Sequence, residues 1–97
     1  MPSQNVSGTI TTGGTAQTLV AFPAGARPRG FWIQNLDDAA TLYIRGDGQA
    51  ATAGVGSIVM NPGDLYETPH FWPVGNPVPS VSVFSTKTGH AFSAEWF

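Results

Sequence analysis

The first stretch that could carry chemistry is Arg45-Gly46-Asp47, the tripeptide that animal integrins recognise on matrix proteins. It follows a strand-like segment ending at Ile44, and Gly-Asp-Gly is a strong turn sequence. In such a turn, the flanking glycines supply the backbone geometry while Asp47 hydrogen-bonds its own backbone. With no cysteine and no basic-then-apolar start, nothing else indicates an extracellular module. We therefore interpret the tripeptide as a turn and do not expect integrin binding.

Metal ligands are the second possibility. His70 and His90 are separated by twenty residues, without the close spacing that brings two imidazoles onto one metal. Calcium loops need several oxygen ligands at tight, repeated spacing, which the acids of the turns do not provide. We interpret these acids as solvated turn residues: Asp37, Asp38, Asp47 and Asp64. No metal and no cofactor is expected.

Catalytic patterns are also missing. Serine, histidine and aspartate occur, but none in a nucleophile setting such as G-x-S-x-G. Glu67 and Glu95 are a conceivable carboxylate pair, yet both fall on expected strands where an outward, solvated position explains them. A domain of this size rarely encloses a deep pocket. We do not expect an enzyme.

Charge is unusually sparse: ten of the 97 residues are Asp, Glu, Lys or Arg, where soluble domains average about a quarter. The net charge is −2, and the four cations are scattered along the chain, so the phosphate-binding cluster that a nucleic-acid partner requires is missing. No apolar run approaches the length of a membrane span. A surface so poor in charge is weakly protected from association. We expect it to be covered partly by other proteins or by copies of the same chain.

Short apolar runs alternate with polar residues, and turn residues separate them, so the chain predicts strands and no significant helix. Turns are expected at Gly13-Gly14, Pro23-Ala24-Gly25, Leu36–Ala39, Gly46-Asp47-Gly48, Asn61–Asp64, Gly75-Asn76-Pro77 and Lys87–Gly89. The expected strands are Val6–Thr11, Gln17–Phe22, Gly30–Asn35, Ala40–Arg45, Gly56–Met60, Leu65–Thr68, Ser80–Ser85 and Ala91–Phe97. Seven or eight strands at this spacing predict an all-β fold, an antiparallel β-sandwich or jelly roll.

Alternation along each strand predicts which side chains face the core. The core set is Phe31, Ile33, Leu42, Ile44, Ile58, Met60, Val81, Val83, Phe92, Ala94 and Trp96. The opposite faces still carry Trp32, Tyr43, Val59, Phe84 and Phe97, which is more apolar than a monomer's outer faces should be.

The start of the chain differs from the rest. Residues 1–16 are rich in Thr, Ser and Gly and hold almost no large side chain, so they predict a flexible or weakly held arm before a single domain over residues 17–97.

The segment from His70 to Pro79, HFWPVGNPVP, is loop-like because four of its ten residues are Pro or Gly, yet it carries Phe71 and Trp72. Two interpretations stay open: the rings cap one end of the sandwich, or they form a protein contact. A sugar-stacking platform is a third.

One linked pattern resembles a known family. A strand ending in IQN, a short acidic turn, TLYIRGDG, the small-residue stretch QAATAG, then GSIVMNPGDLYETP and finally VSVFSTKTGHAFSAEW together resemble small virion-associated proteins of tailed bacteriophages. The match runs from about Phe31 to Trp96 and consists of the order of strands and turns, without residues that carry chemistry. The resemblance implies a β-sandwich, usually homo-oligomeric, that decorates a head shell or forms part of a tail or fibre base. It fixes no binding residue.

Together these observations predict a structural protein of a bacteriophage particle, a capsid decoration or cement protein, located in the virion and assembled in the bacterial cytoplasm. Its expected partners are copies of itself, as a dimer or trimer, and a major capsid or tail protein. The candidate contact residues are Trp32, Tyr43, Phe71, Trp72, Phe84 and Phe97. The alternative function is a tail or spike module that recognises host glycans beside polar groups such as His70 and Asn76.

Overall fold

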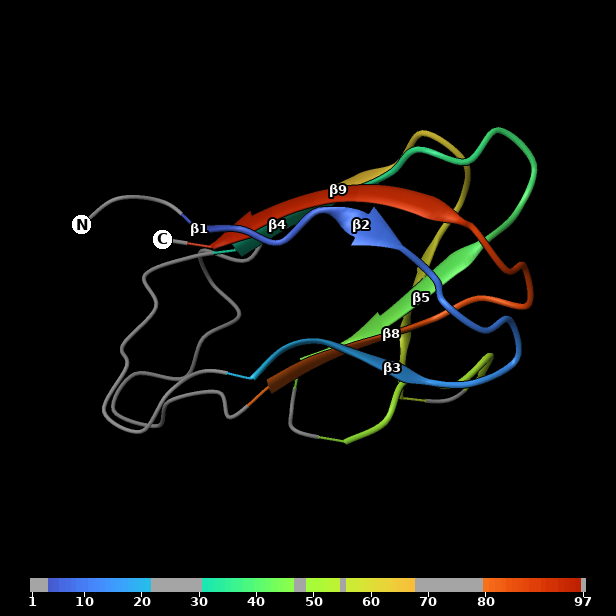
Figure 1. Ribbon diagram of the computed structural model, residues 1–97, viewed down its shortest axis with the longest axis horizontal. Coiled ribbons are helices and arrows are strands. Elements are labelled where there is room, and N and C mark those ends of the chain that lie inside the picture. The colour runs from blue at the N-terminus through green and yellow to red at the C-terminus, as the bar shows by residue number, and fades with distance from the viewer. Residues whose placement is uncertain (1–3, 22–30, 47–48, 55, 68–79, 97) are drawn as a thin grey trace.

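The computed structural model describes residues 4–21, 31–46, 49–54, 56–67 and 80–96. Over these residues the chain forms two antiparallel sheets that lie face to face, with no helix (Figure 1). The described residues consequently offer no helix that could cross a membrane. The predicted all-β, antiparallel β-sandwich is confirmed.

The described strands are β1 (Gln4–Asn5), β2 (Gly8–Thr9), β3 (Gln17–Ala21), β4 (Phe31–Asn35), β5 (Leu42–Arg45), β6 (Ile58–Met60), β7 (Leu65–Glu67), β8 (Ser80–Phe84) and β9 (Ala91–Trp96). Strands β1 and β2 both pair with β9 in continuous antiparallel order, with Gln4 opposite Trp96 and Thr9 opposite Ala91. They are therefore two pieces of one interrupted strand. Counted in this way, the described part of the chain has eight strands, as the turn spacing predicts.

Pairing is nested around the connection between β5 and β6. Strand β5 pairs with β6, β4 with β7, β3 with β8, and β1 and β2 with β9. Two further pairings, β4 with β9 and β5 with β8, join these ribbons into two sheets. One is five-stranded when β1 and β2 are counted separately, ordered β1-β9-β4-β7 with β2 also on β9, and the other is four-stranded, ordered β3-β8-β5-β6. The first and last described strands are thus neighbours.

The core lies between the two sheets and follows the alternation of the strands. In β4, Phe31 and Ile33 are buried, and in β5 the buried pair is Leu42 and Ile44. The rest of the cluster is Ile10, Met60, Val81, Val83, Phe92 and Ala94, with Ile58 and Trp96 partly buried against it. The predicted core set is confirmed, and Ile10 is an addition from the predicted arm.

Residues 4–10 of that arm are paired along β9, and the side chain of Ile10 is 1% exposed. The backbone N–H of Ile10 donates to the carbonyl of His90, and the N–H of Gly89 donates to the carbonyl of Ile10. This part of the arm is therefore docked on the domain through two-residue strands, while the division of the chain after residue 16 stays a prediction.

Two glycines at one end of the sandwich are required by geometry. A Cβ at Gly13 would lie 2.4 Å from the carbonyl oxygen of Thr86, so the turn before β3 can approach the β8–β9 connection only with glycine here. Gly89 has φ of +81°, a left-handed conformation that side chains disfavour. The predicted turns at Gly13-Gly14 and Lys87–Gly89 therefore bring together the two connections, β2–β3 and β8–β9, that cross from one sheet to the other.

Candidate interaction surfaces

The outer face of the four-stranded sheet carries a continuous apolar row, which we define as Val59, Tyr43 and Phe84. These residues are direct cross-strand partners on β6, β5 and β8, with Tyr43 opposite both of the others. The rings of Tyr43 and Phe84 meet edge to face, with centroids 6.0 Å apart and planes at 60°. Val59 is 54% exposed. Alternation forces the row outward because the residues between them face the core.

Next to the apolar row, residues 49–54 cross the same sheet face. Ala51 is 1% exposed, and its backbone N–H donates to Ser82 Oγ over 3.0 Å. Arg45 lies beside Gly56, where a Cβ would come within 2.5 Å of the guanidinium, so glycine allows the close approach. The loop therefore covers part of the sheet and leaves the apolar row as its exposed portion.

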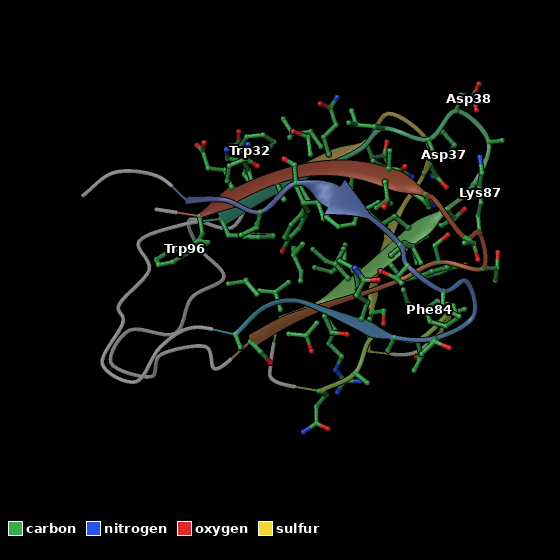
Figure 2. The ribbon with its side chains drawn as sticks, viewed as in Figure 1. Trp32, Asp37, Asp38, Phe84, Lys87 and Trp96 are labelled. Carbon is green, nitrogen blue, oxygen red and sulfur yellow. The ribbon has the colours of Figure 1, made fainter. Side chains whose placement is uncertain are left out.

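The outer face of the five-stranded sheet is different in kind. Trp32 on β4 lies between two glutamates, with Glu67 of β7 as its partner on one side and Glu95 of β9 on the other. The indole N–H donates to Glu95 Oε1 over 3.4 Å. Trp32 is half-buried and projects from this face, as Figure 2 shows. The two glutamates thus flank the tryptophan across the sheet, on its outer face as expected.

A buried polar network closes the end of the sandwich that holds the β8–β9 connection, which crosses from one sheet to the other. His90 and Ser85 are both 0% exposed, and His90 Nδ1 is 2.8 Å from Ser85 Oγ. His90 Nε2 lies 2.7 Å from Asn35 Oδ1. Asn35 Nδ2 donates to the carbonyls of Ala40 and Met60, each over 3.0 Å. Since Asn35 Oδ1 is then the acceptor, His90 carries its proton on Nε2 and accepts from Ser85 through Nδ1.

This arrangement gives both ring nitrogens of a neutral His90 a hydrogen-bond partner. Burial lowers the pKa of His90 below its usual 6.5, with Asp37 opposing and Lys87 adding to the shift. A second proton on Nδ1 would displace the hydrogen that Ser85 donates. The Ser85 hydroxyl also accepts the backbone N–H of Lys87, over 3.1 Å, so its own proton is directed to His90.

Asp37 extends the network to the surface. Its Oδ1 accepts the N–H groups of Ala39 and Ala40, and its Oδ2 pairs with Lys87 Nζ. The hydrogen bond from Lys87, together with the two backbone donors, holds the pKa of Asp37 well below its usual 3.8. The same partner raises the pKa of Lys87. The interpretation of Asp37 as a solvated turn acid is therefore wrong: its side chain is buried, with Lys87 of the β8–β9 connection on one oxygen and the backbone of Ala39 and Ala40 on the other.

Ser85, His90 and Asn35 stand in the order of a nucleophile, a base and an orienting residue, but the hydroxyl is closed off. A surface depression is lined by Asn35 and Asp37 and by other described residues. Neither Ser85 nor His90 is part of its lining. The hydrogen bonds of the network connect β4 and β9 of one sheet to the ends of β6 and β8 of the other, which is a structural role. The expectation that the chain is not an enzyme stays a prediction.

The structure places three of the six candidate contact residues. Trp32 lies on the five-stranded face, while Tyr43 and Phe84 lie together on the four-stranded face. Their role in contacts stays a prediction. Outside the described residues lie Phe71, Trp72 and Phe97, together with His70, Asn76 and Asp47 of the glycan and integrin hypotheses. Arg45 and Gly46 are described, and Gly46 is buried.

Sequence reasoning missed the buried network. A signal was present: Asn35 continues the parity of Phe31 and Ile33, and Ser85 continues that of Val81 and Val83. Polar residues at core positions must find partners. No cluster of three or more potential metal ligands occurs in the part of the chain that the structure describes.

No family model, no curated protein and no solved structure matches this chain.

Proposed function

We propose that the chain is a structural protein of a bacteriophage particle, a capsid decoration or cement protein that acts through protein–protein contacts and assembles as a dimer or trimer. The observation that carries this proposal is the apolar row on the four-stranded sheet, because its aromatic pair faces outward on a chain that has few charges to oppose association. Aromatic side chains dominate the energetics of protein interfaces.

The strand order supports the same proposal at the level of fold. The nested pairing around β5 and β6, wound into sheets ordered β1-β9-β4-β7 and β3-β8-β5-β6, has the order expected of a jelly roll. Viral capsid proteins use this architecture, and so do lectins and cupins. Fold alone does not decide among them, so this support is an analogy.

The size of the apolar row limits what it can do alone. A standard interface buries about 800 Å² on each partner, whereas three side chains at about 150–250 Å² for an aromatic cover only part of that area. At about 25 cal/mol per Å² the row contributes a few kcal/mol before the cost of association. A stable particle contact therefore needs additional residues, for which Phe71, Trp72 and Phe97 are the sequence candidates.

Light scattering over a range of protein concentrations tests the self-association directly. The proposal predicts a dimer or trimer that dissociates on dilution, and assembly with a phage shell or tail protein can then be measured by co-sedimentation. A strict monomer that co-sediments with no shell or tail protein would sink the proposal. The glycan alternative depends on the segment around His70 and Asn76, outside the described residues, and a saturable change in tryptophan fluorescence on glycan addition would favour it.

A further inference from the structure

We propose that the outer face of the five-stranded sheet binds an arginine side chain of a partner protein, with the guanidinium stacked on Trp32 between Glu67 and Glu95. This inference does not rest on the phage assignment, because any partner that presents an exposed arginine would satisfy it. It concerns the face opposite the apolar row and a different chemistry.

Geometry is the first support. Trp32 is the direct neighbour of both glutamates across the sheet. Neighbouring strands lie about 4.8 Å apart, so the backbone positions of the glutamates are about 10 Å apart with the indole between them. The hydrogen bond to Glu95 holds the indole against one carboxylate. A cation within about 6 Å of the ring centroid would lie within reach of both glutamate side chains.

Charge is the second support. Of the two cations in the described residues, Lys87 is paired with Asp37 and Arg45 lies on the outer face of the other sheet. Neither neutralises Glu67 or Glu95. Two carboxylates on one face, with no described cation beside them, set up a negative potential over the tryptophan, and the charge complementarity favours a positive ligand over a neutral sugar.

The shape of the site favours arginine. A guanidinium is planar, stacks on aromatic rings and presents its N–H donors in a fixed fork, so one group can cover the indole while donating to a carboxylate on each side. The neighbouring row of Gln34, Leu65 and Ser93 carries no charge and would border the peptide backbone of such a partner.

The test uses the whole chain and a capped Gly-Arg-Gly peptide, with the citrulline peptide as a neutral analogue of the same shape. Binding is followed by the indole Nε1–H resonance of Trp32 in NMR, assigned with Trp32→Phe. An exposed cation–π contact with two exposed ion pairs predicts half-saturation on the order of 10 mM. The citrulline peptide should bind at least fivefold more weakly, and added salt should weaken binding of the arginine peptide.

Glu67→Gln and Glu95→Gln should each lower the affinity for the arginine peptide several-fold. Glu95→Gln keeps an acceptor for the indole N–H. Asp38→Asn removes the same charge from an exposed turn far from Trp32 (Figure 2) and should change affinity less than twofold. An unshifted Trp32 resonance, equal binding of the citrulline peptide, or unchanged affinity in both glutamine variants would each overturn the proposal. A neutral disaccharide that shifts Trp32 equally in wild type and both variants would overturn it as well, in favour of a sugar site.

Discussion

The two outer faces of the sandwich are built by the same alternation and have opposite chemistry. On the four-stranded sheet, Tyr43 has Val59 and Phe84 as its cross-strand neighbours. On the five-stranded sheet, Trp32 has Glu67 and Glu95. Both central residues are aromatic and half-buried, so the neighbours make the difference. The core constrains the inward positions alone, which leaves each outer face free to acquire its own partner.

The largest expected effect on stability comes from the buried polar network that holds the two sheets together. Asn35→Ala should destabilise the fold by about 3–5 kcal/mol, because it leaves the carbonyls of Ala40 and Met60 and the Nε2–H of His90 without a partner in the interior. Urea unfolding measures the change. Its neighbour Gln34 faces outward, and Gln34→Ala should cost within about 0.5 kcal/mol. Equal effects of the two variants would show that the network does not join the sheets.

A charge in the apolar row should weaken self-association strongly. Tyr43→Lys places an ammonium where the proposed interface would bury it, so dissociation constants should rise at least tenfold. Light scattering measures the change, and circular dichroism checks that the β-sandwich persists. Thr12→Lys adds the same charge on an exposed turn and should leave the mass unchanged. Self-association undisturbed by Tyr43→Lys would exclude the four-stranded face as the contact.

Acid should weaken the buried polar network that joins the two sheets. His90 is held neutral and its pKa is lowered, so its contribution to stability is complete above about pH 6.5 and declines as the pH falls below that value, where the unfolded chain takes up a proton first. The lowered pKa of Asp37 adds a further loss as the pH falls below about 3.8.

Urea unfolding at pH 8, 6.5 and 5.5 measures the first decline. His90→Gln removes the titrating group and should flatten the dependence in that window, whatever its absolute stability, leaving any contribution from His70. An identical slope in both proteins would assign the pH dependence to other groups.

The smallest effect separates the faces most cleanly. Val59 and Leu65 are 54% and 56% exposed and lie on opposite sheets. Val59→Ser and Leu65→Ser should therefore change the stability of the monomer by similar, small amounts, about 1 kcal/mol or less. Only Val59→Ser should reduce self-association, by a few-fold. A larger loss for Leu65→Ser would move the contact to the other sheet.

Most of the fold was accessible from the sequence because it depends on local pattern. The eight expected strands correspond to the described ones, seven of them with boundaries within two residues, and the described turns at Gly14, Gly63 and Gly89 have the positive φ that their glycines predicted. The first strand is the exception, since it begins earlier and is broken between Asn5 and Gly8.

The interior chemistry was not accessible in the same way. Asn35 and His90 are 55 residues apart in the chain, and Asp37 and Lys87 are 50 apart. Only the pairing of β4 with β9 brings these residues together, and no local pattern encodes that pairing. For the same reason, Trp32 was identified as outward, but its position between two glutamates depends on register across three strands.

Methyl NMR of Val59 and Leu65 over a dilution series is the most direct test of the claim that the two faces have different partners. The account predicts that the Val59 resonances shift with concentration as copies of the chain associate, while those of Leu65 stay constant. A concentration-dependent shift confined to Leu65, or constant resonances at both positions, would contradict it.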